Sequence, residues 1–205
     1  TPSLVPSTFL DKLFSEICIT SETEITIEAN PSSVNLENAK VWKKNKINRV
    51  SLGVQALNDE RLKWLGRVHS KAEAYKALEN IFCADIKRVS IDYIVGVPAQ
   101  TSQQIIEELT KLLCLFPQIE HVSAYLLTLQ PSNPKTKELP NDEIQLEHLN
   151  VVSTLLRENG FEHYEISNFA KPGSRAFHNE NYWLGGSYLG IGPSAHSFWK
   201  NSQKR

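Results

Sequence analysis

Three polar side chains in the first half of the chain lie where strand-like stretches of sequence end or are interrupted, and a fourth follows a helical stretch. Glu28 lies near the end of the first stretch, Gln55 follows the second, and Asp92 lies inside the third. Arg67 follows a short helical stretch in the sequence LGRVH. Carboxylates accept hydrogen bonds from hydroxyl and ammonium groups, and a guanidinium binds a carboxylate through two parallel donors. These four residues are therefore candidates for ligand binding.

Structural roles compete with this interpretation. Glu28 is equally suited to capping a turn, Gln55 to a solvated turn, and Arg67 to a surface ion pair. Asp92 differs because it lies between isoleucine and tyrosine, where burial of an unpaired carboxylate costs several kcal/mol by order of magnitude. We therefore interpret Asp92 as functional.

The sequence HNENYW near the end of the chain offers a different chemistry. The His178 imidazole can bind haem iron, and the rings of Tyr182 and Trp183 suit a flat macrocycle. Spacing alone favours a packed aromatic corner with one hydrogen-bonded histidine.

Two further groups favour ordinary structural roles. Cys18, Cys83 and Cys114 lack the spacing of a metal or iron–sulfur site, and we expect them to be buried thiols. The segment 40–49, KVWKKNKINR, carries five basic residues, which we interpret as a solvated helix end rather than a nucleic-acid contact.

The elements that must position these residues alternate along the chain. Helical patterns, with apolar residues three and four apart, and strand patterns, rich in β-branched residues, follow one another at short spacing. The predicted helices are 7–17, 36–44, 59–65, 71–83, 101–115 and 142–158, with Thr101 as an N-cap and Asn159-Gly160 as a C-cap. The predicted strands are 24–29, 47–54, 88–95 and 120–127.

This alternation predicts parallel βα units. No glycine-rich phosphate loop follows a strand, so a dinucleotide-binding sheet is disfavoured. A βα barrel is favoured, because polar residues at the carboxyl ends of its strands meet at one rim. We expect residues 1–159 to form this core. Residues 160–205 hold six of the nine glycines and nine of the eighteen aromatic residues, and we expect them to form a separate layer or cap.

The composition excludes several classes of protein. Twenty-two basic residues nearly balance 23 acidic ones, which argues against disorder and against binding of nucleic acid by bulk charge. No apolar run approaches the ~18 residues of a membrane span. Scattered cysteines favour a cytoplasmic protein, with peripheral membrane association left open. The chain contains no Met, so we expect it to be part of a longer protein.

Taken together, the motifs resemble the HemW branch of radical SAM proteins, haem chaperones related to oxygen-independent coproporphyrinogen III oxidase. The resemblance keeps order and spacing over nearly the whole chain. Its motifs are TPS (1–3), EANP (28–31), SLGVQ (51–55), LGRVHS (65–70), IDYIVGVPAQT (91–101), YEISNFA (164–170), HNENYW (178–183) and YLGIGPSAHS (188–197).

The resemblance implies a partial (β/α)6 radical SAM barrel, truncated at its N-terminus. It implies that S-adenosylmethionine is bound by five residues and that haem is bound by HNENYW, with His178 as the tentative iron ligand and Tyr182 and Trp183 beside it. The five residues are Thr1, Glu28, Gln55, Arg67 and Asp92.

One departure limits the chemistry. The CxxxCxxC motif that holds the 4Fe-4S cluster in the family is absent, so we expect this chain alone to be inactive in radical chemistry. The function implied is a chaperone that delivers haem to acceptor proteins, and the alternative is a coproporphyrinogen III oxidase. The ligand is then haem or a porphyrin, and a homodimer stays open.

Overall fold

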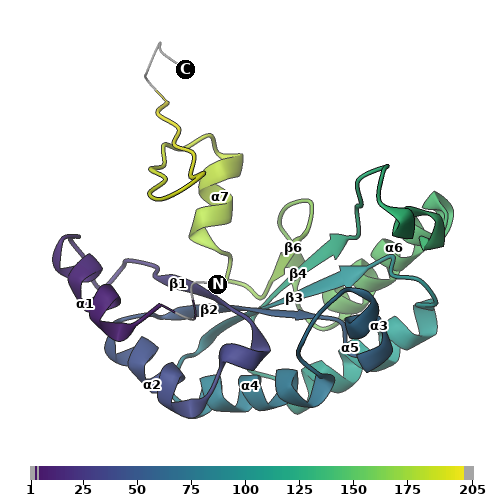
Figure 1. The fold of residues 1–205 in the computed structure, drawn as a ribbon, viewed down its shortest axis with the longest axis horizontal. Coiled ribbons are helices and arrows are strands. Elements are labelled where there is room, and N and C mark those ends of the chain that lie inside the picture. Colours follow the sequence, from purple (N-terminus) through teal and green to yellow (C-terminus); the bar gives the residue numbers. More distant parts are fainter. Residues whose placement is uncertain (1–2, 4, 201–205) are drawn as a thin grey trace.

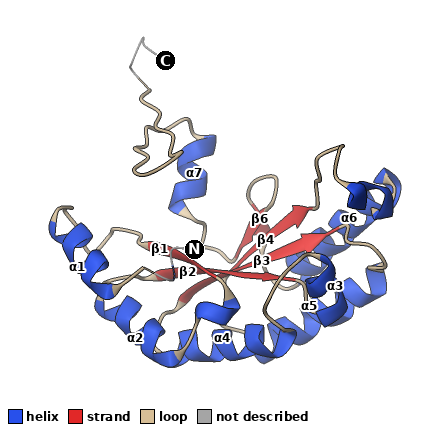
Figure 2. Cartoon of the chain, in the orientation of Figure 1, coloured by secondary structure: helices blue, strands red, loops and turns tan. Residues whose placement is uncertain are grey.

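The computed structural model describes residue 3 and residues 5–200. Its centre is a six-stranded sheet in the order β1-β2-β3-β4-β6-β5 (Figure 2). The strands are β1 (Thr26–Ala29), β2 (Arg49–Gln55), β3 (Arg88–Val95), β4 (His121–Leu126), β5 (Glu162–His163) and β6 (Asn168–Ala170). The first four strands are parallel, and β6 and β5 pair antiparallel. The predicted parallel βα arrangement is therefore confirmed for the first four strands.

Helices connect the strands, and their observed bounds lie close to the predicted ones. They are α1 (Ser7–Ser15), α2 (Leu36–Lys44), α3 (Asp59–Trp64), α4 (Lys71–Cys83), α5 (Ser102–Leu115), α6 (Asp142–Glu158) and α7 (Phe177–Trp183), with the short 3-10 helices η2 (Pro31–Ser33) and η3 (Pro134–Glu138). Thr101 caps α5 as predicted, because its hydroxyl accepts from Gln104 N and the Gln104 side chain accepts from Thr101 N. Gly160, at φ 82°, follows α6.

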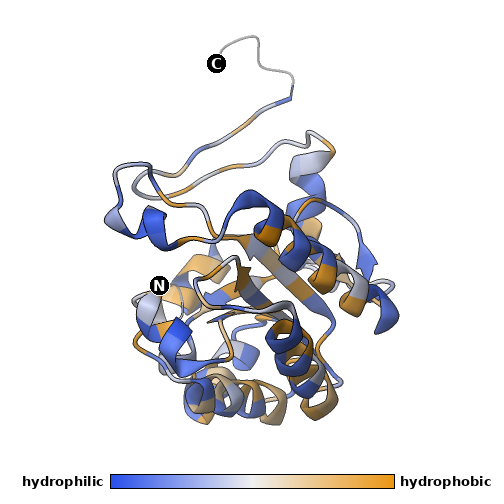
Figure 3. Ribbon diagram, turned by 90° about the vertical axis from the view of Figure 1, so that its right-hand side faces the viewer, coloured by the Kyte–Doolittle hydropathy of each residue, from blue (hydrophilic) through white to orange (hydrophobic). Residues whose placement is uncertain are grey.

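Side-chain alternation gives the sheet two different faces. Successive residues of a strand point to opposite sides, and one side of β1–β4 is almost wholly apolar and buried. Its residues are Ile27, Ala29, Val50, Leu52, Val54, Val89, Ile91, Tyr93, Val95, Val122 and Ala124. Figure 1 shows α2, α4 and α5 along this side of the sheet and α7 on the other. The helices place their hydrophobic residues toward the sheet and their polar residues toward solvent. Orange and blue segments therefore alternate along each helix (Figure 3).

A buried polar cluster joins α3 and α5 to β3. Arg61 forms an ion pair with Glu108 and donates to Gln104 Oε1 at 3.0 Å. The Tyr93 hydroxyl donates to Glu108 Oε2 at 3.2 Å and accepts from Gln100 Nε2 at 3.2 Å. The cluster fixes the outer helices without using the polar face of the sheet.

Part of the segment that we expected to form a separate layer joins the sheet instead. Strands β5 and β6 lie within residues 160–205, and β6 pairs with β4. Beyond Ala170 the chain leaves the sheet, and α7 follows. The division at residue 159 stays a prediction. None of the described helices is long and apolar enough to cross a lipid bilayer.

The cysteine prediction is wrong. All three thiols are exposed. Cys83 is the last residue of α4. Cys114 lies in the last turn of α5, between the buried residues Leu113 and Phe116, but on the side of the helix that faces solvent. A helix position next to a buried one is commonly solvent-facing, because adjacent residues lie about 100° apart around the axis.

Truncation of the core should separate buried from exposed leucines on one helix. Leu109 of α5 is fully buried, whereas Leu115 of the same helix is 53% exposed. We expect Leu109→Ala to lower the free energy of unfolding by about 2–5 kcal/mol, because it removes buried methyl groups and leaves a cavity. Leu115→Ala, the matched control, should change it by no more than about 0.5 kcal/mol. Urea denaturation measures both, and equal losses would contradict the packing described.

Candidate functional site

The polar face of the sheet forms the floor of a cleft of about 1400 Å³. Strands β1–β4, with Glu24 just before β1, supply the floor, and α7 and the segment 188–196 supply the opposite wall. The floor residues are Glu24, Thr26, Glu28, Arg49, Ser51, Asp92, Ser123 and Tyr125. The alternation that buries the apolar face therefore places these polar side chains together in the cleft.

Asp92 lies at the centre of this floor. Its Oδ1 accepts a hydrogen bond from Ser51 Oγ at 3.1 Å. Burial raises the pKa of Asp92 to about 6, and hydrogen bonds from the Ser51 and Ser123 hydroxyls only partly oppose that rise. Glu28 raises it further by charge repulsion, and Arg49 lowers it. The sequence-based expectation that Asp92 needs partners agrees with these contacts, which come from the two neighbouring strands.

The predicted S-adenosylmethionine residues do not all meet. Glu28 and Asp92 line the cleft. Gln55 ends β2 at φ 65°, a left-handed conformation that non-glycine residues rarely adopt. Its amide covers Gly53, where an added Cβ would lie 2.7 Å from Gln55 Nε2. Arg67 is exposed in the loop between α3 and α4 and is not among the residues that line the cleft. Thr1 lies outside the described residues.

The predicted haem residues lie on α7. His178 and Tyr182, one helical turn apart, both line the cleft, and their rings meet edge to face at a centroid distance of 4.7 Å. Trp183 is 58% exposed and is not among the lining residues. The structure thus brings two of the three together, opposite the carboxylates of Glu28 and Asp92.

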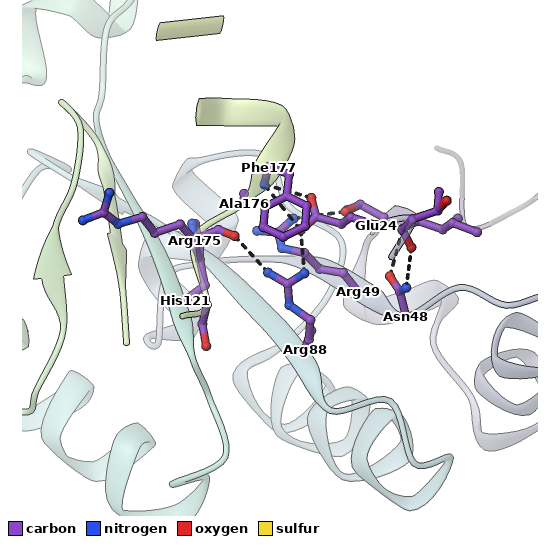
Figure 4. A network of polar contacts seen from close by, with 12 residues as sticks. Glu24, Asn48, Arg49, Arg88, His121, Arg175, Ala176 and Phe177 are labelled. Atoms are coloured by element: carbon purple, nitrogen blue, oxygen red, sulfur yellow. Dashed lines mark hydrogen bonds and ion pairs between the residues drawn. The ribbon is translucent and has the colours of Figure 1, made fainter. Parts of the chain in front are cut away.

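An ion pair at the amino ends of the strands fixes the start of α7 (Figure 4). Arg88 Nη1 lies 2.7 Å from Glu24 Oε2, and Arg88 Nη2 donates to Arg175 O at 2.9 Å. Glu24 also accepts from Phe177 N, at 3.2 and 3.4 Å. Ala176 at the N-cap has no side-chain acceptor, so Glu24 performs that role from a distant part of the sequence.

A second, partly buried chain of hydrogen bonds reaches the same helix. The His121 ring bonds Ser90 Oγ at 2.7 Å and the Tyr164 hydroxyl at 2.8 Å. That hydroxyl also accepts from Asn179 Nδ2 at 3.4 Å. Burial, with the nearby arginines Arg49 and Arg88, lowers the pKa of His121 to about 3, so the ring is neutral. The residues around His178 are therefore tied to the sheet on both sides.

Sequence reasoning missed Arg49, Ser51 and Ser123, which line the cleft. Their signal was available, because each lies an even number of residues from a cleft-facing neighbour on its strand. The prediction that Arg49 belongs to a solvated basic segment is wrong, because Arg49 is 6% exposed and begins β2.

The described residues do not supply a metal cluster. No group of three His, Cys, Asp or Glu side chains among them is arranged to hold a metal ion.

The raised pKa of Asp92 predicts a specific pH dependence of stability. A carboxyl whose pKa is higher in the folded than in the unfolded state favours folding while it is protonated. That contribution is lost as pH rises from the ordinary pKa of 3.8 through about 6. Asp92→Asn removes the titration, so we expect the advantage of the variant over the wild type to grow as the pH rises from about 4 and to reach about 2–3 kcal/mol above about pH 6. Urea denaturation across this range measures the gain.

Asp11→Asn, at an exposed position of α1, is the control. A similar pH-dependent gain in both variants would show that Asp92 does not carry the effect.

Comparison with known proteins shows which family this chain resembles. The model of the radical SAM superfamily matches residues 5–112. The chain is 37% identical over 207 residues to the mitochondrial radical S-adenosyl methionine domain-containing protein 1 of Mus musculus, covering 96% of this chain and 46% of that protein. It is 38% identical over 203 residues to the heme chaperone HemW of Buchnera aphidicola subsp. Schizaphis graminum, covering 96% and 53%. The chain thus spans about half the length of these relatives.

A solved structure confirms the fold. The coproporphyrinogen III oxidase HemN of Escherichia coli, a radical SAM enzyme, superimposes with a TM-score of 0.80 at 21% identity, over 96% of this chain and 50% of that one. The predicted radical SAM barrel fold and the predicted resemblance to HemW-type proteins are both confirmed. The chain belongs to the radical SAM superfamily.

Proposed function

We propose that this chain is the S-adenosylmethionine-binding and haem-binding part of a haem chaperone. The observation that carries the proposal is that the carboxylates of Glu28 and Asp92 line the same cleft as His178 and Tyr182. One cleft then offers acidic groups for a cationic cofactor and an imidazole for iron. The similarity to proteins named heme chaperone supports this choice.

The donor set fits S-adenosylmethionine. Its sulfonium and ammonium groups are positive, and its ribose carries hydroxyls. Glu28 and Asp92 offer carboxylates to these groups, and Ser51 offers a hydroxyl that can donate or accept. Gln55 and Arg67 stay predicted contacts, with Gln55 at the carboxyl end of β2, where barrel proteins bind ligands. When bound in proteins of this superfamily, the cofactor supplies a 5′-deoxyadenosyl radical.

The described residues offer no group of three ligands that would fit the 4Fe-4S cluster. The part of the proposal that this chain can carry is binding: it holds the cofactor and the haem side by side, and acceptor proteins receive the haem from the whole protein.

His178 is then the ligand of the haem iron. Neutral imidazole is an ordinary axial ligand of haem iron. The Tyr182 ring lies edge to face against the His178 ring and limits the rotation of that ring. Glu24 and Tyr164 hold the helix that carries it. The oxidase alternative shares the predicted cofactor residues, such as Glu28 and Asp92, and the likeness to HemN, at 21% identity, shows the fold alone.

Hemin titration followed at the Soret band tests this assignment. We expect saturable binding to the wild type and at least about tenfold weaker binding to His178→Ala, with a shifted Soret maximum, because an axial ligand is lost. His163→Ala is the matched control, since His163 bonds Ile166 O outside the cleft. Equal binding by all three proteins would contradict the assignment.

Calorimetric titration with S-adenosylmethionine tests the cofactor site. Glu28→Gln removes a charge but keeps the shape of the side chain. We expect about tenfold weaker binding or more, because a charge-assisted hydrogen bond contributes about 1.5–3 kcal/mol. Glu37→Gln on the exposed start of α2 should bind like the wild type. Unchanged affinity in Glu28→Gln would remove Glu28 from the site.

A further inference from the structure

The floor of the cleft contains a buried cation with few partners. Arg49 is 6% exposed and lines the cleft. Among the described residues its guanidinium makes one hydrogen bond, from Nη1 to Thr26 Oγ1 at 3.4 Å. A guanidinium carries five N–H donors. A buried charge normally has an ion-pair partner, because desolvation otherwise makes it costly.

The carboxylate that attracts Arg49 most strongly, that of Glu24, is already engaged. Glu24 forms its ion pair with Arg88 at 2.7 Å and accepts from Phe177 N. Glu24 attracts Arg49 electrostatically, but the two make no ion pair within 4.0 Å in the described structure. Burial lowers the pKa of Arg49 and repulsion from Arg88 lowers it further, while Asp92 opposes this only as the weakest of the attractions. The positive charge at this end of the cleft therefore exceeds what Glu24 neutralises.

The strand register separates this cation from the acidic groups. Thr26 lies opposite Arg49, and Glu28 lies opposite Ser51. One pleat repeat, about 7 Å along the strand, thus divides the basic position from the acidic one. A ligand with a positive and a negative group can satisfy both positions at once.

We propose that Arg49 is an anion-binding site of the cleft and takes a carboxylate of the bound ligand through its two-pronged guanidinium. The inference rests on the proposed function for the identity of the ligand. Two sources offer the same chemistry: a propionate of the tetrapyrrole and the α-carboxylate of S-adenosylmethionine. In either case the carboxylate completes the partners of Arg49, and the site selects ligands that carry an acid group.

The test compares ligands with and without the carboxylate. One arm titrates hemin against hemin dimethyl ester, and the other titrates S-adenosylmethionine against its decarboxylated form. Each arm uses the wild type, Arg49→Gln, Arg49→Lys and the control Arg157→Gln, whose arginine is exposed on α6. We expect the wild type and Arg157→Gln to prefer the acid by about tenfold or more in one arm, which identifies the source.

Arg49→Gln should bind the acid and the neutral form alike in that arm, and Arg49→Lys should keep part of the preference, because a lysine retains the charge without the fork. If Arg49→Gln fails to fold, Arg49→Lys and the wild-type preference carry the test. No preference in either arm for the wild type, or a preference that Arg49→Gln retains, would overturn the inference.

Failure of the proposed function has a different signature. In that case the wild type binds neither hemin nor its ester. Failure of the Arg49 site alone leaves hemin bound, with no carboxylate dependence that traces to Arg49.

Discussion

The two-residue repeat of the β-strand is the constraint on which the rest of this structure depends. Each of the first four strands must place apolar side chains under the helices, and every such residue fixes the direction of its neighbours. Ile91 and Tyr93 point into the core, so Asp92 points the other way. A shift of one residue in β1, β2 or β3 would turn a carboxylate or a guanidinium toward the apolar side of the sheet. The hydrophobic core and the polar cleft are therefore specified by the same register.

The wall of the cleft depends on a different interaction. Strand pairing does not hold α7, which has seven residues, none of them buried. Its position comes instead from the Glu24–Arg88 ion pair at its first turn and from Tyr164 beside Asn179. Charged hydrogen bonds to partly buried groups are stronger than surface pairs. The helix that carries His178 is thus attached at its amino end, while its far end continues into the exposed segment 184–200.

Much of the fold could be predicted from the sequence, because periodicity reports directly on burial. The limits of α2, α4 and α6, and of strand β3, agree with the residues at which the patterns change. Strands β5 and β6 could not be predicted in the same way. They are two and three residues long, and their pairing depends on the edge of β4 rather than on any pattern of their own.

The site was predictable to a smaller extent, for a physical reason. Asp92 stood out because a carboxylate in an apolar strand is costly. Arg49 did not, because it follows four lysines in sequence, and only its place at the start of β2 buries it. Arg67 shows the converse: its motif is distinctive, but the loop that carries it turns the side chain to solvent in this structure.

The half-buried carboxyl of Asp92 also lets the cleft release a proton when a ligand binds. Its pKa of about 6 means that, near that pH, a substantial fraction of molecules carries a proton there. A cation that settles beside this group expels the proton, because the ionised form is then favoured. Occupation of the cleft by a positive ligand is therefore coupled to proton release. In mildly acidic solution the affinity of the cleft for such a cation falls by up to tenfold for each unit by which the pH is lowered.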